Sequence, residues 1–114
     1  MKIIVAGATG RMGRTLIEAI LRAADTTLSG ALEVPGNPQL GKDAGELAGS
    51  HCGVAVTADY ASAIAAADCL IDFTRPEGTL DHLRVCADRG VRAVIGTTGF
   101  SPEQRKSIEA AAAR

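Results

Sequence analysis

Three glycines that follow the first apolar stretch carry the clearest chemical signal in the chain. Residues 3–6 read Ile-Ile-Val-Ala, which is typical of a buried strand, and Gly7, Gly10 and Gly13 come directly after it. A glycine turn that opens a helix directs free backbone N–H groups and the positive end of the helix dipole at one point, which suits a pyrophosphate. The spacing between Gly7 and Gly10 is one residue wider than the spacing of the first two glycines in the usual dinucleotide fingerprint. An ordinary strand-to-helix turn, with glycines kept for packing, therefore stays open as an alternative.

An acid at the end of the next apolar stretch is the second candidate. Glu33 ends the run 27–33 and follows Gly13 by 20 residues, about where a dinucleotide fold places a carboxylate on the adenosine ribose hydroxyls. Val34 follows the acid, and neither Pro35 nor Gly36 supplies a cation for a ribose 2′-phosphate. This predicts that NADH is preferred and NADPH is possible, since Arg11 inside the glycine turn has the length to reach a phosphate. A surface glutamate at a strand end is the plainer alternative.

Strands and helices alternate along the rest of the chain. The predicted strands are 3–6, 27–33, 54–57, 69–73 and 92–95, and the predicted helices are 11–23, 59–67, one that follows Thr74 and stops at Gly90, and one that begins at 101. A long connection covers 35–53, with a short helical turn at 43–48. This order predicts an α/β fold, a Rossmann-like doubly wound parallel sheet, in one dinucleotide-binding domain over residues 1–114.

Ligands of such sheets bind beyond the carboxyl ends of the strands. The turns after the first, second, fourth and fifth strands therefore converge on one site. They are 7–13, Glu33, 73–75 and 96–99.

Charge and hydropathy exclude several classes of function. The formal net charge of −1 gives no electrostatic basis for binding nucleic acid or an anionic membrane. The apolar runs are too short to span a bilayer, and the N-terminus enters a strand without the pattern of a signal peptide. We therefore expect a cytoplasmic protein.

The cysteines and histidines do not form a metal or catalytic pattern. Cys52, Cys69 and Cys86 lack zinc-type spacing, so we expect no metal and interpret them as buried or loop thiols. His51 falls in the long connection and His82 in a helix pattern. Each is interpreted as a surface or partly packed histidine, because no matching base or ligand is near it in sequence.

Four motifs together resemble the N-terminal domain of the dihydrodipicolinate reductases, also called 4-hydroxy-tetrahydrodipicolinate reductases, over nearly all of the chain. They are Val-Ala-Gly-Ala-Thr-Gly-Arg-Met-Gly at 5–13, Asp-Ala-Gly-Glu-Leu at 43–47, Ile-Asp-Phe-Thr-Arg-Pro-Glu-Gly-Thr at 71–79 and Val-Ile-Gly-Thr-Thr-Gly-Phe at 94–100. The third and fourth motifs are highly specific to the family.

The resemblance implies a role for each turn. It places the pyrophosphate on the first turn, the adenosine ribose on Glu33, the nicotinamide ribose beside the turn after the fourth strand, and the nicotinamide at the turn after the fifth. The implied cofactor residues are Gly7, Ala8, Thr9, Gly10, Arg11, Met12, Glu33, Phe73, Thr74, Gly96, Thr97 and Thr98. The resemblance also places Thr98 where the substrate carboxylate would meet the cofactor.

The resemblance further implies hydride transfer from a nicotinamide cofactor to a cyclic, unsaturated dicarboxylate in lysine and diaminopimelate biosynthesis. The family's catalytic half, which carries a His-His-x-x-Lys type signature, is not found in this sequence. We therefore expect no catalytic residue here, a fragment that binds cofactor without turnover, and a homotetrameric full enzyme. Two alternatives stay open: a stand-alone nicotinamide-sensing module, and the cofactor domain of another two-domain dehydrogenase, such as a homoserine or aspartate-semialdehyde type.

Overall fold

The computed structural model describes residues 1–49, 52–74, 76–96 and 102–104, and its five strands form one sheet in which every strand pairing is parallel. In chain order the elements are β1 (Lys2–Ala6), α1 (Arg11–Arg22), β2 (Thr27–Leu32), a 3₁₀ helix η1 (Ala44–Ala48), β3 (Val56–Thr57), α2 (Tyr60–Ala65), β4 (Cys69–Asp72), α3 (Pro76–Arg89) and β5 (Arg92–Ile95). Of the helix expected from 101, residues 102–104 are helical and the rest lies outside the described residues.

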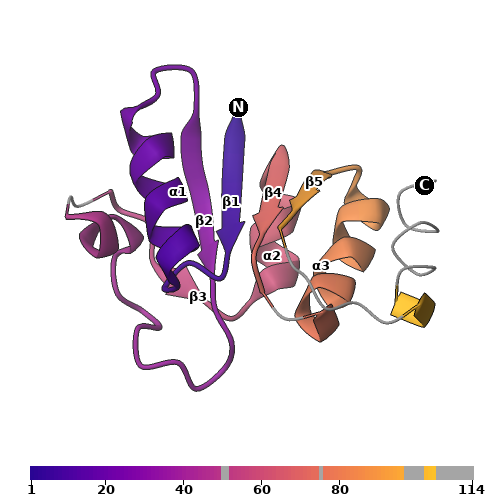
Figure 1. Cartoon of the computed structure of the whole chain (residues 1–114). Helices are drawn as coiled ribbons and strands as arrows, with labels where there is room; N and C mark the ends of the chain where they lie inside the picture. The colour runs from indigo at the N-terminus through magenta and orange to yellow at the C-terminus, as the bar shows by residue number, and fades with distance from the viewer. Residues whose placement is uncertain (50–51, 75, 97–101, 105–114) are drawn as a thin grey trace.

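The strand order β3-β2-β1-β4-β5 reverses direction between β1 and β4. The chain first builds outward from β1 to β3, then returns across the sheet to β4 on the other side of β1 (Figure 1). Such a switch point leaves a crevice at the carboxyl ends of the two central strands, where ligands of doubly wound sheets bind. The predicted Rossmann-like fold is confirmed.

Alternate residues of β1 face opposite layers, which explains its unbroken apolar run. Ile3 and Val5 pack with α1 in one buried cluster, whereas Ile4 and Ala6 pack with α2 and α3 in the other. A parallel sheet covered on both faces needs apolar side chains at every position of its central strand.

β3 is shorter than the predicted strand 54–57, because its first half bonds to the long connection. The Ala44 N–H donates to the Val54 carbonyl (2.7 Å), and the Val56 N–H donates to the Lys42 carbonyl (2.9 Å). Only Val56 and Thr57 pair with β2. The connection is thereby tied to the edge of the sheet, and η1 packs against α1.

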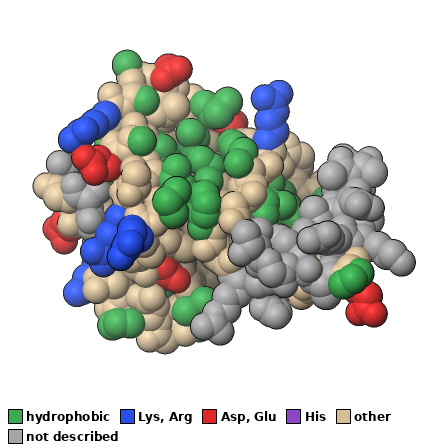
Figure 2. All heavy atoms as spheres, in the orientation of Figure 1, with side chains coloured by type: hydrophobic (Ala, Val, Ile, Leu, Met, Phe, Trp, Pro, Cys, Tyr) green, Lys and Arg blue, Asp and Glu red, His purple; other side chains and the backbone are tan. Residues whose placement is uncertain are grey.

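The α1 side of β4 and β5 is only partly covered within the described residues. Ile71 is half-buried, and Val94, its register partner on β5, is 56% exposed. Figure 2 shows hydrophobic side chains gathered in the middle of this face. In the described part of the chain, no helix has the length and apolar character needed to cross a membrane.

Candidate functional site

The turn between β1 and α1 is anchored to β2 through a single carbonyl. The N–H groups of Gly7 and Ala8 both donate to the Leu32 carbonyl, at 3.0 and 3.1 Å. Gly7 has φ +81°, in the left-handed region that favours glycine. The turn therefore leaves β1 sharply and brings the start of α1 to the carboxyl edge of the sheet.

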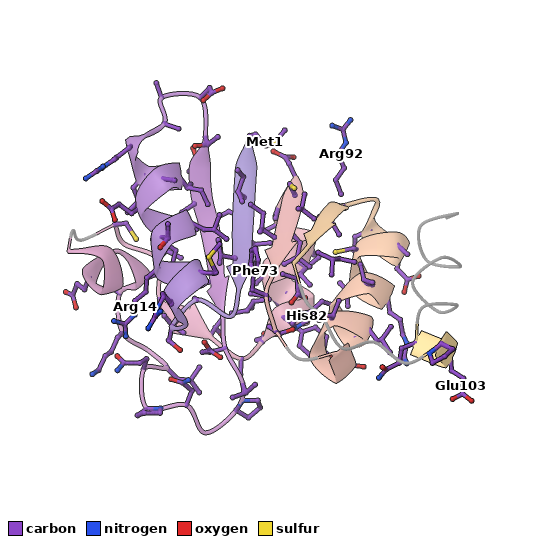
Figure 3. The ribbon with its side chains drawn as sticks, in the orientation of Figure 1. Met1, Arg14, Phe73, His82, Arg92 and Glu103 are labelled. Atoms are coloured by element: carbon purple, nitrogen blue, oxygen red, sulfur yellow. The ribbon has the colours of Figure 1, made fainter. Side chains whose placement is uncertain are left out.

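The first turn of α1 has the features of an anion site. Gly10 is the N-cap residue and supplies no side-chain cap, and no acid occurs in the first turn. Arg11 and Arg14 are exposed, and the Arg14 Nε donates to the Thr9 carbonyl at 3.1 Å (Figure 3). Uncapped amides, the helix dipole and two guanidinium groups all favour negative charge at this point.

The three glycines serve different purposes. A Cβ at Gly13 would collide with the Gly7 carbonyl oxygen and would stand 2.8 Å from the Ala8 backbone, so close packing requires this glycine. A Cβ at Gly10 would meet only the Gly7 carbonyl oxygen, at 3.4 Å, which is ordinary contact. The packing alternative left open by the sequence therefore accounts for Gly13 and leaves Gly10 unexplained by sterics.

Glu33 closes the turn from the side of β2. Thr9 donates to Glu33 Oε2 through both its N–H (3.0 Å) and its hydroxyl (2.6 Å), and the Val34 N–H donates to Oε1 (3.2 Å). Asn37, which sequence reasoning missed, donates from Nδ2 to the Thr9 hydroxyl at 3.4 Å. The acid and the glycine turn thus form one hydrogen-bonded group, as their predicted convergence requires.

Phe73 joins the turns of three strands. Its N–H donates to the Ala6 carbonyl (3.2 Å), and a Cβ on Gly7 would stand 3.1 Å from the Phe73 carbonyl oxygen. The ring lies directly over Gly96, where an added Cβ would collide with it. The predicted convergence of the turns after β1, β4 and β5 is confirmed for these residues, whereas Thr97 and Thr98 lie outside the described residues.

A buried carboxylate that sequence reasoning missed lies directly beneath this turn. Asp72, the last residue of β4, is fully buried, and its Oδ1 accepts hydrogen bonds from the Thr74 N–H (2.8 Å), the Thr74 hydroxyl (2.6 Å) and the Thr79 hydroxyl (3.2 Å). Its Oδ2 lies 2.6 Å from His82 Nδ1. Burial by itself would raise the pKa of Asp72, but the hydrogen bonds from His82 and Thr74 outweigh burial and lower the pKa.

His82 corrects the sequence interpretation, which found no partner for it and made it a surface or partly packed residue. It is 7% exposed, pairs with Asp72 and packs edge-on against Tyr60, with ring centroids 5.1 Å apart. A usable signal was present, because Thr79, His82 and Cys86 fall three and four residues apart on one helix face. The apolar strand that ends in an acid was the matching signal on β4. His51 lies outside the described residues.

The three cysteines have the character of inert thiols. All are free, and burial is the main cause that raises the pKa of each, that of Cys86 to about 11. A thiol needs a lowered pKa to act as a nucleophile near neutral pH. The interpretation as buried or loop thiols is confirmed.

Comparison with known proteins decides the family. The sequence profile of the N-terminus of dihydrodipicolinate reductase matches residues 1–114. The chain belongs to this family. The match confirms the resemblance drawn from the four motifs and decides against the homoserine and aspartate-semialdehyde types.

Two relatives show how much of the reductases the chain spans. The 4-hydroxy-tetrahydrodipicolinate reductase of Nitrosomonas europaea is 59% identical over 112 residues, which is 98% of this chain and 42% of the relative. The reductase of Cupriavidus taiwanensis is 56% identical with the same coverage. The chain therefore spans less than half the length of these relatives.

Solved structures support the same fold. The dipicolinate-bound dihydrodipicolinate reductase from Paenisporosarcina sp. TG-14 is similar with a TM-score of 0.76 and 26% identity, over 98% of this chain and 43% of that one. A UDP-glucuronic acid 4-epimerase from Bacillus cereus in complex with NAD has a TM-score of 0.65 at 14% identity, over 99% of this chain and 52% of that one. The second likeness shows the fold alone.

Proposed function

We propose that the domain binds a nicotinamide dinucleotide across the carboxyl edge of its sheet, as the cofactor-binding half of a dihydrodipicolinate reductase. The observation that carries this proposal is the start of α1, which faces the edge without a side-chain cap. The space at Gly10 and the nearby Glu33 carboxylate support it. Family membership makes the dinucleotide the natural ligand of such a site.

Two groups of residues would hold the cofactor. Residues 7–12 would hold the pyrophosphate through backbone N–H groups, and Glu33 would exchange its bond to the Thr9 hydroxyl for the adenosine ribose hydroxyls. The nicotinamide end would lie at the turn after β4 and at the turn after β5. Its residues are Phe73, Thr74, Gly96, Thr97 and Thr98.

The surroundings of Glu33 favour NADH over NADPH. Val34 is 58% exposed where a cation would be needed beside a 2′-phosphate, and its N–H already donates to Glu33. A phosphate there would meet the Glu33 carboxylate, and the nearby guanidinium groups of Arg11 and Arg14 would only partly offset that repulsion. We therefore propose a preference for NADH with NADPH accepted.

The whole reductase would act on a cyclic, unsaturated dicarboxylate in lysine and diaminopimelate biosynthesis. The cofactor supplies the hydride when bound, and the domain positions it. Thr98 would meet a carboxylate of the substrate. We propose a cytoplasmic homotetramer for the full enzyme and no turnover by these 114 residues alone, because the family's proton donor and carboxylate-binding residues belong to its other half.

Calorimetric titration with NADH and NADPH tests the binding proposal. We expect both to bind, NADH more tightly, and Glu33→Gln to weaken NADH about tenfold, in keeping with the loss of a charged hydrogen-bond acceptor. Glu18→Gln is the matched control, since it removes the same charge from an acid that pairs with Arg22 instead. If neither NADH nor NADPH binds, the binding proposal is contradicted. If NADPH binds more tightly than NADH, only the proposed preference for NADH is contradicted.

A further inference from the structure

Burial of the Asp72–His82 pair is unfavourable in free energy unless its hydrogen bonds offset the loss of water. A carboxylate taken out of water carries a large desolvation cost, and apolar residues of similar volume often stabilise a core at least as well. The pair and the Thr79 hydroxyl are buried together, and Leu70, which faces the same side of β4 as Asp72, belongs to an apolar cluster with Ile4 and Ile64. A buried ion pair is therefore weak evidence of a role in stability alone.

The two carboxylate oxygens serve different parts of the chain. Oδ2 pairs with His82 of α3, whereas Oδ1 accepts the N–H and hydroxyl of Thr74 and the hydroxyl of Thr79. Holding Oδ2 on the imidazole fixes the rotation of the carboxylate. Oδ1 is then directed at the turn that follows β4.

The turn after β4 fixes the position of Phe73. The residue lies between Asp72 and Thr74, both held by this network, and its carbonyl faces Gly7 while its ring covers Gly96. Figure 3 shows His82, a residue of α3, near β4 and well to the side of Arg14, which follows the glycine turn. A change at His82 should act first on the β4 end of the site, because the glycine turn is held separately by the Leu32 carbonyl and the Glu33 carboxylate.

We propose that His82, through Asp72, is a positioning residue for the nicotinamide half of the cofactor site. It makes no contact with the cofactor itself, and acts by holding Phe73 and Thr74 in the geometry that receives the nicotinamide ribose. This inference rests on the proposed function. It assigns to the buried Asp72–His82 pair an effect on binding of the nicotinamide half of the cofactor and not of the adenosine half.

The test compares NADH with ADP, which keeps the adenosine and pyrophosphate but lacks the nicotinamide ribose and ring. In His82→Leu the donor to Oδ2 is lost, and we expect NADH affinity to fall about tenfold, in line with the loss of a hydrogen bond to a charged group. ADP affinity should stay within about twofold of the wild-type value, since the Leu32 carbonyl and Glu33, not Asp72, hold the glycine turn. In His82→Asn an amide N–H stands near the place of Nδ1, so NADH affinity should recover to within about threefold.

Cys86→Ala is the matched control. Cys86 is 3% exposed on the same face of α3, one turn beyond His82, and its truncation removes buried volume without removing a hydrogen bond to Asp72. If loosening α3 were enough to weaken NADH, Cys86→Ala would reproduce the effect. We expect it to change neither ligand's affinity.

Equal losses of NADH and ADP in His82→Leu, or unchanged NADH affinity, would overturn the inference. If His82→Leu does not fold, Thr79→Val gives the same comparison, because it deletes a hydroxyl donor to Oδ1 without changing side-chain shape. NADH must then weaken against ADP, and an unchanged ratio overturns the inference. If the wild-type chain binds neither NADH nor ADP, the proposed function fails and the inference fails with it. If the wild-type chain binds NADH and ADP equally well, the nicotinamide half contributes nothing to affinity, and only the inference fails.

Discussion

The turns that follow β1 and β4 face each other across the switch point of the sheet, and they are built differently. The first is shaped by glycines, held by backbone N–H groups that share the Leu32 carbonyl, and closed at its edge by the part-buried Glu33 carboxylate. The second is held from below by Asp72, whose oxygens bind side chains of Thr74, Thr79 and His82. The turn after β1 leaves main-chain N–H groups exposed at the start of α1, whereas the turn after β4 is supported by a buried network around Asp72.

The difference follows from what each turn would bind. A pyrophosphate is recognised by main-chain N–H groups, so side chains must be kept away from it. A nicotinamide ribose needs a surface of side chains in fixed positions, and fixed side chains need support from the residues behind them. Substitutions that act on only one turn should therefore separate the two halves of the ligand.

Gly13→Ala should have the largest effect. Its Cβ would collide with the Gly7 carbonyl, so the turn or the whole of α1 must move. Overpacking of this kind costs about 1–3 kcal/mol in the free energy of unfolding. Urea denaturation should show that loss, and NADH and ADP should both bind at least about tenfold more weakly, because the pyrophosphate site is distorted.

Gly10→Ala is the control for that substitution. A methyl group fits at this N-cap, where φ is −74°, so the free energy of unfolding should fall by no more than about 1 kcal/mol, the usual difference between glycine and alanine at an N-cap. Both ligands should nevertheless weaken, because the methyl group occupies the approach to the first turn of α1. Unchanged affinity in Gly10→Ala would show that the anion does not bind there.

Gly96→Ala should have a smaller effect, on the opposite half of the site. The added Cβ would meet the Phe73 ring, which can swing away at a cost of about 1 kcal/mol. NADH should weaken while ADP keeps its affinity. Combining Gly96→Ala with Phe73→Leu should restore most of the lost stability, and strictly additive losses in urea denaturation would argue against the ring contact.

The sequence predicted the first turn well because its determinants are local. The apolar run 3–6, the glycines and Glu33 each reveal themselves by type and spacing within one strand-turn-helix unit. Asp72 and His82 become partners only when α3 packs on the sheet. Each carries a local signal, an acid that ends an apolar strand and a histidine on the buried face of a helix, but nothing local pairs the two. The short β3 has a similar cause, since Val54 bonds to the connection that precedes it rather than to β2.

Asp43 is a third carboxylate that holds a loop in this domain, and its substitution should have the smallest effect of those considered. It is partly exposed, caps η1 by accepting from the Gly45 N–H (2.8 Å), and ties in the Cys52 N–H (3.0 Å) and the Gly53 N–H (2.6 Å). The Cys52 backbone hydrogen bond is the main cause that lowers the pKa of Asp43, to about 2 from its usual 3.8.

Because the pKa of Asp43 is lower in the folded state, its contribution to stability is present above about pH 4 and is lost as the pH falls toward 2. Asp43→Asn should therefore be less stable than wild type in urea at pH 7, and the gap should close near pH 2. A gap independent of pH would mean that shape, not charge, holds the loop. Cofactor affinity at pH 7 should not change, because this loop lies outside the proposed site.

The most direct test of two turns sharing one ligand is a titration of the ¹⁵N-labelled chain with NADH and, separately, with ADP. Amide resonances of Gly10, Arg11 and Met12 should shift with both ligands, whereas those of Phe73, Thr74 and Gly96 should shift with NADH alone. Shifts at the second group with ADP as large as with NADH, or none at the first group with either ligand, would contradict the division of the site between the two turns.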